Sequence, residues 1–541
     1  MNVGEMISNS EPHRDVGHET MAVTYPGGAM MGTFGLMDKE RCLFMTTEDP
    51  EFIACELKII GSYTDHGAIT MTVDKHLCCK NTSMTTAPVR VELYRGKWYR
   101  SAERYLEWIR PYRRHHGHEV PRWIREMSGF LLVVMKMQYG YEHYSYDDLP
   151  KIYEMAKAHG FDTLGLFGWY DSGHDNMYPD LKISESMGGE ASFKENIKKV
   201  QDAGGRVMLY YQGHLIDPLS DFYQNGIGKD IQSINIWGYP YIDNWSFAHN
   251  SFFLAYYTGK TFTQACPACP EWRSLMVEKE RWLSSFGVDG VLYDQIGGLD
   301  PFPCFNENHP HEGNNPARAM SCGQARLVAD LQDESKKISP QFAFMSEMFT
   351  DIYSGSLDLV HGCPNYPGEK NERDYQIGGD RGSVIFPDFQ RYIFPEAVVT
   401  GRHSSPNCPK RYVNYLFLYH YIPQMGVRFK ACHDDIQNDV FAEERIYCAQ
   451  VTALRQKYVK EIPYATYTDV LGIENDDPYL MARGFASDDA LYVTLWNDSD
   501  EARTPNIRVQ GRTLQSFETV DGCSSIPVEL GPQSVAIAVY R

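Results

Sequence analysis

The sequence lacks any run of the ~18 consecutive apolar residues that a membrane-spanning helix needs, so we expect no membrane partner. Positive charge is also scarce, because 51 Lys and Arg residues stand against 71 Asp and Glu residues and give a formal net charge of -20. Such a chain repels polyanions, and no basic run accompanies its aromatic residues. We therefore expect no nucleic-acid partner.

The dense cysteine spacing of a disulfide-rich secreted domain is missing too, since the 13 Cys residues are scattered along the chain. Residues 2–16 show neither the basic start nor the apolar centre of an export signal. These two absences predict a cytoplasmic protein with reduced thiols. A secreted protein whose signal peptide had been removed would show the same features. No pattern in the sequence indicates an oligomeric state.

Aromatic residues, in contrast, are abundant and make up 13% of the chain, with 36 Tyr, 26 Phe and 9 Trp. An amphipathic ring suits the apolar faces and hydroxyl edges of sugars, although a large core would account for about half of these rings. A chain of 541 residues exceeds the size at which one core stops growing. It predicts a central domain of ~250–350 residues with one or two smaller partners.

The local patterns divide the chain into three parts. Short β-type runs separated by turn residues predict a β-sandwich near the N terminus, followed by an amphipathic helix at 101–114. After Pro121 strand-like runs alternate with helical segments, and beyond Pro463 short alternating runs return. We expect a β-sandwich plus linker helix in residues 1–120, a barrel in 121–462 and a second β-sandwich in 463–541.

The middle part predicts an α/β fold, a (β/α)8 TIM barrel flanked by the N-terminal and C-terminal β-sandwiches. Eight strands are predicted at 130–137, 162–170, 206–214, 288–294, 342–347, 357–361, 383–386 and 426–430. Helices are predicted at 146–159, 193–203, 272–286, 317–338 and 443–458.

The connection at 215–270 is far longer than a usual βα loop and is rich in Phe, Tyr and Trp. Long βα loops lie over the mouth of a barrel. We interpret the connection as a substrate lid or subsite wall; the alternative is a small packed subdomain that supports the barrel.

Two predicted strands end in a carboxylate, Asp294 and Glu347. Catalytic groups of barrel enzymes lie at the carboxyl ends of the strands, and glycoside hydrolysis uses a carboxylate pair. We predict Asp294 as the nucleophile and Glu347, beside Met345 and Phe349, as the acid/base. A structural role as a helix cap or ion pair is the alternative for Asp294, and Asp351 is an alternative acid.

Polar and aromatic residues after other strands are candidates for substrate binding, because carboxylates and His bind sugar hydroxyls and a Trp or Tyr stacks on the sugar ring. Each could also be structural. The candidates are Trp169, Asp171, His174 and Asp175 after the second strand, His214 after the third, His361 after the sixth and Arg402 after the seventh. Arg402, with Arg391 and His403, could engage an anionic sugar.

Several motifs together resemble an uncharacterised bacterial family of glycoside-hydrolase-like TIM barrels, which is distantly similar to the α-galactosidase, α-glucosidase and endo-α-N-acetylgalactosaminidase barrels. In those relatives an Asp on the fourth strand is the nucleophile and a Glu or Asp on a later strand the acid/base, which implies Asp294 and Glu347. Many members have a larger N-terminal β domain, which implies a shortened form here. The motifs are Tyr25-Pro26-Gly27, Gly173-His174-Asp175, Tyr178-Pro179-Asp180, Gly188-Gly189, the segment from Cys266-Pro267 to Pro270-Glu271-Trp272, and Tyr293-Asp294-Gln295.

No cofactor or metal is expected for this chemistry. Cys266 and Cys269 form a lone CxxC without a second pair, which argues against a zinc ribbon or a redox site. The acidic turn at 475–477 is interpreted as a solvated turn in preference to a calcium site.

We therefore predict a glycoside hydrolase that cleaves an α-linked sugar with retention of configuration. Three alternatives stay open: an inverting hydrolase with the same carboxylates, a carbohydrate-binding barrel without activity, and a lyase, isomerase or epimerase. A lyase would need a basic pair at a strand end, and none is clear. The sugar, the linkage and endo or exo action stay open as well.

Overall fold

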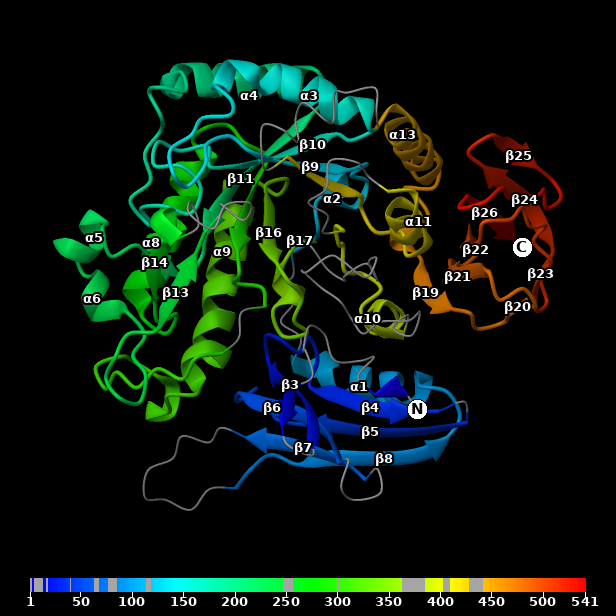
Figure 1. Cartoon of the computed structure of the whole chain (residues 1–541), viewed down its shortest axis with the longest axis horizontal. Coiled ribbons are helices and arrows are strands. Elements are labelled where there is room, and N and C mark those ends of the chain that lie inside the picture. Colours follow the sequence, from blue (N-terminus) through cyan, green and yellow to red (C-terminus); the bar gives the residue numbers. More distant parts are fainter. Residues whose placement is uncertain are drawn as a thin grey trace.

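The computed structural model describes residues 2–3, 13–15, 18–38, 40–62, 68–75, 85–112, 118–246, 256–298, 301–361, 385–401, 409–427 and 441–541. Within these ranges the structure contains no helix that is long and apolar enough to cross a membrane. Three regions follow one another along the chain: antiparallel sheets, a parallel sheet covered by helices, and further antiparallel sheets (Figure 1).

The centre of the molecule is a curled sheet of seven parallel strands in the order β17-β16-β15-β11-β10-β9-β18. Its strands read as nearly continuous apolar runs and are buried, as expected of a sheet that is covered on both faces. The strands are β9 (Phe130–Val134), β10 (Thr163–Phe167), β11 (Arg206–Gln212), β15 (Gly290–Asp294), β16 (Ala343–Glu347), β17 (Leu359–His361) and β18 (Gln424–Val427).

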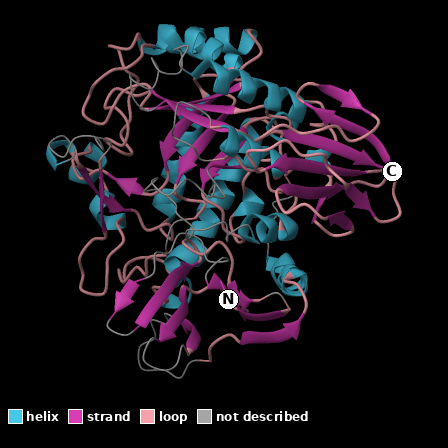
Figure 2. Ribbon diagram, turned by 45° about the vertical axis from the view of Figure 1, so that its right-hand side comes forward, coloured by secondary structure: helices cyan, strands magenta, loops and turns pink. Residues whose placement is uncertain are grey.

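Helices cover the outside of this sheet (Figure 2). Helix α3 packs on β10, α4 on β11, α8 on β15 and α9 on β16, so each of these helices precedes in the chain the strand that it covers. The helices of this region are α2 (Arg122–Arg125), α3 (Leu149–Ala158), α4 (Gly189–Asp202), α8 (Pro270–Ser284), α9 (Ala325–Ile338), α10 (Ile385–Ile393), α11 (Lys410–Leu418) and α13 (Ala442–Gln456). Short 3-10 turns lie at Tyr146–Asp148, Glu312–Asn314, Ser354–Ser356 and Ile462–Tyr464, and a π-helical turn at Ala319–Gln324.

Seven of the eight predicted strands overlap strands of the sheet, and the prediction at 383–386 is wrong for its described part. Residues 385 and 386 begin α10, in which Phe389 and Ile393 are buried four residues apart. A run of three apolar residues is too short to distinguish a strand from the first turn of a helix. Of the last predicted strand, residues 428–430 lie outside the described part.

A short segment lies between the two edges of the curled sheet. Val399 forms a parallel bridge with Val360 in β17, and Thr400 forms one with Ile422, two residues before β18. The N–H of Thr400 donates to the carbonyl of Val360 (2.9 Å), and the N–H of Ile422 donates to that of Val399 (2.9 Å). These bonds connect β17 to the start of β18.

Two four-stranded antiparallel sheets precede the parallel sheet. Val23, Phe34 and Leu57 come from both sheets and belong to one buried cluster, so the sheets pack on each other. One sheet contains β1 (Asn2–Val3), β4 (Thr33–Met37), β5 (Arg41–Thr47) and β8 (Val89–Arg95); the other contains β2 (His13–Asp15), β3 (His18–Tyr25), β6 (Cys55–Ser62) and β7 (Ile69–Lys75). Helix α1 (Tyr99–Ile109) and the turn Arg110–Tyr112 connect them to the next region.

The long connection after β11 has regular structure of its own. A three-stranded antiparallel sheet contains β12 (Leu215–Ile216), β13 (Ile242–Trp245) and β14 (Lys260–Gln264), with α5 (Asp221–Gln224) and α6 (Gly228–Ile231) beside it. Several rings of the connection are exposed, namely Trp237, Tyr239, Tyr256 and Tyr257.

The C-terminal region contains a six-stranded and a two-stranded antiparallel sheet. The six strands are β19 (Thr466–Asp469), β21 (Leu480–Ala486), β22 (Leu491–Asn497), β26 (Val535–Tyr540), β24 (Leu514–Thr519) and β25 (Gly522–Ser524), and β20 (Ile473–Asn475) pairs with β23 (Ile507–Val509).

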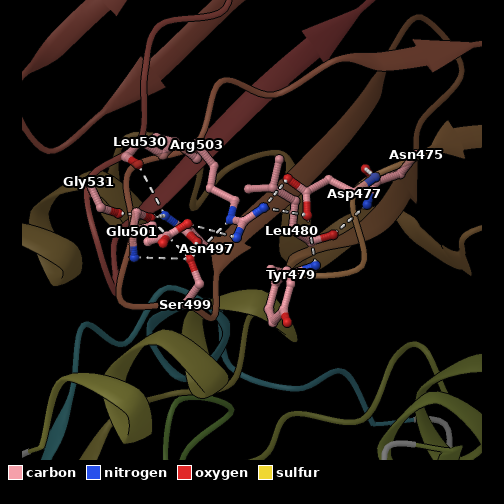
Figure 3. Close-up of polar contacts among 10 residues, drawn as sticks. All are labelled: Asn475, Asp477, Tyr479, Leu480, Asn497, Ser499, Glu501, Arg503, Leu530 and Gly531. Carbon is pink, nitrogen blue, oxygen red and sulfur yellow. Dashed lines mark hydrogen bonds and ion pairs between the residues drawn. The ribbon is translucent and has the colours of Figure 1, made fainter.

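Polar contacts hold the loops of this region together (Figure 3). The guanidinium of Arg503 lies over the ring of Tyr479 and within 3.2 Å of a carboxylate oxygen of Asp477. The side-chain amide of Asn497 donates to the carbonyls of Leu530 (3.1 Å) and Gly531 (2.9 Å). Asp477 belongs to the acidic turn at 475–477, for which the sequence favoured a solvated turn over a calcium site. In the structure its carboxylate pairs with the guanidinium of Arg503.

Candidate active site

The carboxyl ends of β15 and β16 bring the two predicted catalytic carboxylates together. The strands are parallel neighbours with Tyr293 opposite Ser346, so Asp294 and Glu347 follow at the same edge of the sheet. The side chain of Glu347 is buried and hydrogen-bonds with that of Asp294. Their proximity agrees with the expectation from the sequence, and their catalytic role stays a prediction.

The surroundings of Asp294 favour its protonated form. Burial raises the pKa of the Asp294 carboxyl well above its ordinary value, and the nearby charge of Glu347 raises it further. Two carboxylates in hydrogen-bond contact need a proton between them, because two ionised groups would repel each other and offer no donor. The pair can thus hold one proton and present one ionised carboxylate, which suits acid/base chemistry.

Tyr210 on β11 connects this pair to the loop after β10. Its hydroxyl lies 2.8 Å from Oδ2 of Asp294 and 3.0 Å from Oδ1 of Asp175. The side-chain amide of Gln212, two residues along the same strand, donates to Oδ2 of Asp294 at 3.2 Å. Residues two apart on a strand share a face, so β11 presents two donors to one carboxylate.

His174 and Asp175, two of the predicted substrate contacts, lie next to this network. The Asp175 carboxylate accepts a hydrogen bond from the Tyr178 hydroxyl at 3.1 Å and lies 3.5 Å from Nε2 of His174. The His174 ring packs against the rings of Phe167 and Tyr210, at centroid distances of 5.3 and 4.8 Å. The structure therefore groups His174 and Asp175 with Asp294 through Tyr210.

Trp169 and Asp171 lie in different surroundings. Trp169 is fully buried, stacks on Phe193 of α4 with ring planes 4° apart, and donates from Nε1 to the carbonyl of Tyr210 at 2.9 Å. These contacts pack the sheet against α4. The side chain of Asp171 is 59% exposed and lies 3.9 Å from the amine of Lys136. The structure brings neither side chain into the network around Asp294.

Of the remaining predicted contacts, His361 lies beside the carboxylate pair, whereas His214 lies in the long connection. His214 is buried, and its Nε2 lies 3.7 Å from Asp243 in the three-stranded sheet of the long connection. His361 lies opposite Glu347 in the register of β16 and β17, and its ring is 6.4 Å from that of Phe167. Arg402, like His403, lies outside the described residues.

Two side chains that the sequence suggested as alternatives have structural partners. Asp351 is fully buried and accepts hydrogen bonds from the hydroxyls of Tyr25 in the N-terminal sheets and Tyr105 in α1. The Arg391 guanidinium donates to the carbonyl of Ala397 at 2.7 Å and lies over the ring of Tyr421. These contacts give both residues a role in packing.

The backbone changes direction just after both carboxylates. Gln295, which follows Asp294, has φ 64°, and Met348, which follows Glu347, has φ 66°. Non-glycine residues rarely adopt this left-handed conformation, and such strain concentrates at functional sites. The backbone therefore leaves β15 and β16 in the same left-handed conformation, directly after each carboxylate.

Sequence reasoning missed Tyr210, Gln212 and Tyr178. A Tyr in a buried strand is indistinguishable by composition from a core residue. The available signal was the spacing of Tyr210 and Gln212, two polar side chains on one face of an otherwise apolar strand.

No metal-holding group of three or more His, Cys, Asp or Glu side chains in the described part of the chain includes Asp294 or Glu347. One such group, Cys266, Cys304, His309 and His311, lies away from the carboxylate pair. A cavity of about 1080 Å³ lies at the other end of the sheet, lined by Arg125, Gln341 and Asp358, which precede β9, β16 and β17 in the chain. Barrel enzymes place their chemistry at the carboxyl ends of the strands, so this cavity is not the candidate site.

Residues 85–400 match the family described as "Domain of unknown function (DUF6259)", which covers more than half of the chain. The chain belongs to this family. Two curated relatives have names that indicate glycosidases. A "Putative glycoside hydrolase" of Bacteroides thetaiotaomicron is 32% identical over 27% of the chain, and "Putative glycoside hydrolase 22789" of Monosiga brevicollis is 22% identical over 50% of it. The matches span only 20% and 24% of those two proteins.

Solved structures of glycosidases share the fold. The ligand-free α-N-acetylgalactosaminidase NagBb of Bifidobacterium bifidum superposes with a TM-score of 0.62 at 14% identity, over 87% of this chain and 74% of its own. The GH36 α-galactosidase AgaA of Geobacillus stearothermophilus gives 0.56 at 12% identity, over 96% and 71%. This member of the DUF6259 family is therefore structurally like α-glycosidases.

Proposed function

We propose that this protein is a retaining glycoside hydrolase that acts on an α-linked sugar, with Asp294 as the nucleophile and Glu347 as the acid/base. The observation that carries the proposal is the hydrogen-bonded pair of carboxylates, Glu347 buried and Asp294 half-buried, at the carboxyl ends of adjacent parallel strands. The names of the structural neighbours, an α-N-acetylgalactosaminidase and an α-galactosidase, support the α linkage.

In the reactive state the one proton of the pair lies on Glu347, because the Tyr210 and Gln212 donors stabilise the ionised form of Asp294. In the first step the ionised Asp294 attacks the anomeric carbon while Glu347 gives its proton to the leaving oxygen, and a glycosyl ester forms. In the second step Glu347 takes a proton from water, which attacks the same carbon and releases Asp294. The Tyr210 and Gln212 donors both contact Oδ2 of Asp294, so attack through Oδ1 keeps them in place. A hydrogen-bonded pair leaves no room for the water that an inverting pair holds between carboxyl groups ~6.5–9.5 Å apart, and its separation is nearer to the ~5–5.5 Å of a retaining pair, which favours retention.

The proposal includes a complete eight-stranded barrel. The hydrogen bonds of Val399 and Thr400 to both neighbouring strands support these residues as its short seventh strand. We place the domains at residues 1–120, 121–462 and 463–541, with the flanking sheets as β-sandwiches. His174 and Asp175 are the proposed substrate contacts closest to Asp294. The exposed rings of the connection at 215–270 are proposed to form a wall of the site.

The test is hydrolysis of aryl α- and β-glycosides by the wild type, Asp294→Asn and Glu347→Gln, with the anomer of the first product read by NMR. We expect release from an α-glycoside by the wild type and retention of configuration. Asp294→Asn should lose turnover on every substrate. Glu347→Gln should still form the glycosyl ester from aryl glycosides with good leaving groups, because those leave without a proton, and should fail on poor ones.

The matched control is Asp171→Asn, an exposed carboxylate after β10 that should keep the wild-type rate. Full activity in both Asp294→Asn and Glu347→Gln would overturn the proposal. A product with inverted configuration would show an inverting hydrolase, in which Asp294 and Glu347 act as general base and general acid. Glycan binding without turnover across α- and β-linked substrates would favour a carbohydrate-binding protein.

A further inference from the structure

Four buried side chains that are scattered in the sequence meet at one point away from the carboxylate pair. Cys266 lies just after β14, whereas Cys304, His309 and His311 lie in the connection between β15 and α9. Their ligand atoms all lie within 4.8 Å of one another. Both cysteines are fully buried, and both histidines are only 7% exposed.

The distances suit a tetrahedral metal centre. Sγ of Cys266 is 3.5 Å from Nε2 of His311, and Sγ of Cys304 is 3.3 Å from Nδ1 of His309. Zinc bonds of ~2.3 Å to sulfur and ~2.0–2.1 Å to nitrogen require ligand atoms roughly 3.3–3.8 Å apart. The two sulfur atoms are not joined in a disulfide.

His309 is held in the orientation that a metal ligand needs. Its Nε2 lies 2.7 Å from the carbonyl of Asp230 in α6. A carbonyl only accepts, so Nε2 carries a proton, and Nδ1, which faces Cys304, is the nitrogen that can bind a metal. Metal-binding imidazoles commonly donate their second N–H to a carbonyl in this way.

We propose that Cys266, Cys304, His309 and His311 bind one structural zinc ion. Two thiolates and two imidazoles form the Cys2His2 set of structural zinc sites, and four protein ligands close the coordination sphere, which separates the site from catalytic zinc centres with an open position. The lone CxxC motif contributes only its first cysteine, because Cys269 is not part of the cluster.

The zinc ion would connect two segments beside the candidate active site. Cys266 ends the long connection that follows β11, the strand of Tyr210, and Cys304 lies ten residues after Asp294. The two segments already touch, since the N–H of Phe305 donates to the carbonyl of Ile234 at 2.8 Å. A metal ion bound by both segments would fix the long connection to the loop that follows Asp294.

The experiment measures metal content and cobalt spectra of the full chain, purified under reducing conditions. We expect about one zinc per chain in the wild type. Replacement by Co²⁺ should give the visible bands of a tetrahedral site together with thiolate charge-transfer bands. Cys304→Ser and His311→Gln should lose most of the zinc, whereas Cys269→Ser, a buried cysteine of the same motif, should keep it.

Removal of the metal from the wild type provides a readout that does not depend on the folding of a variant. A chelator should lower the melting temperature by ~5 °C or more, and Zn²⁺ but not Mg²⁺ should restore it. The proposal is overturned if the reduced wild type, incubated with Zn²⁺, holds none, or if its cobalt form lacks thiolate bands. Equal loss of zinc in Cys269→Ser and Cys304→Ser, or a Cys266–Cys304 disulfide in a chain that stays metal-free after reduction, would also overturn it.

Discussion

The hydroxyl of Tyr210 lies between two carboxylates, 2.8 Å from Asp294 and 3.0 Å from Asp175. Burial, followed by the charges of Asp175 and Asp294, raises the pKa of Tyr210 well above its ordinary range, so its hydroxyl stays protonated and donates. A donor to a carboxylate stabilises the ionised form, and the Tyr210 bond opposes the rise in the pKa of Asp294. Tyr210 therefore keeps Asp294 available as a nucleophile in the proposed reaction.

The variant Tyr210→Phe should reduce kcat/KM about 10- to 100-fold, the range expected for a lost hydrogen bond to a charged group. Loss of the donor also raises the pKa of Asp294, so the acidic limb of the pH profile of kcat/KM should move to higher pH. The control is Tyr211→Phe, because the adjacent Tyr211 hydroxyl donates to the carbonyl of Pro179 instead. Equal profiles for both variants would contradict the role of Tyr210.

The carboxylate pair should cost the folded protein stability, which a pH series can measure without any substrate. The pKa of Asp294 is raised in the folded chain, so stability is highest below the unfolded value of ~3.9 and falls as the pH rises towards the folded value. Each unit of this difference corresponds to ~1.4 kcal/mol. Asp294→Asn should therefore unfold at higher urea concentration than the wild type at pH 8, by about 1–3 kcal/mol, and match it near pH 4.

The control for this series is Asp171→Asn, whose side chain is 59% exposed, and its free energy of unfolding should follow the wild type at every pH. A wild type more stable than Asp294→Asn at pH 8 would show that the native state does not strain the pair. Active sites commonly lower the free energy of unfolding in this way, because they hold ionisable groups in positions that function requires.

The sequence predicted the carboxylates because each ends a long apolar run, a pattern that depends only on local spacing. Asp294 and Glu347 were found in this way, and so were the strands that hold them. The segment that joins the sheet edges was missed because Val399 and Thr400 pair through two isolated bridges, too short for a period to appear. The sequence instead predicted the seventh strand at residues 383–386, whose described part is helical.

Contacts between residues far apart in the chain could not be predicted from the sequence either. The link from Tyr210 to Asp175 needs the register of β10 and β11, which a single sequence does not contain. Cys266 and His311 are 45 residues apart, so the CxxC motif directed attention to Cys269 instead of the real neighbours. The spacing from Cys304 to His309 and His311 was the signal that could have indicated a metal site.

Asp351 connects the central region to the N-terminal sheets, and its bonds should respond to pH. Burial raises the pKa of its carboxyl to about 7, although the hydroxyls of Tyr105 and Tyr25 oppose this rise. Tyr105→Phe removes a donor and should cost about 1–3 kcal/mol when the carboxyl is ionised. The loss should be larger at pH 8 than at pH 5, where the carboxyl is protonated. Urea unfolding at the two pH values provides the measurement.

Tyr94→Phe is the matched control for this prediction, because the Tyr94 hydroxyl contacts the neutral Ser101 hydroxyl at 2.8 Å in the same region. Its loss in unfolding free energy should be the same at both pH values. A pH-independent loss in Tyr105→Phe would show that the charge of Asp351 does not govern this contact.

Asp388 of α10 and Arg483 of β21 join the central region to the C-terminal sheets. Nε of Arg483 donates to one carboxylate oxygen at 2.6 Å and Nη2 to the other at 2.9 Å, and both side chains are buried. Burial raises the pKa of Asp388 to about 6 even with the guanidinium beside it. Arg483→Met should cost about 3–5 kcal/mol near pH 8, because it leaves a buried carboxylate without its partner.

The comparison that isolates burial is Arg503→Met in the same region, since Arg503 and Asp477 also pair but keep 23% and 27% of their side chains exposed (Figure 3). Water screens such a pair, so the loss there should stay at or below about 1 kcal/mol. Adding Asp388→Leu to Arg483→Met should recover part of the stability, because the double change removes the unpaired charge. If both arginine variants lost the same amount, the Asp388–Arg483 pair would contribute no more than a surface contact, and the buried guanidinium would not be what joins the C-terminal sheets to α10.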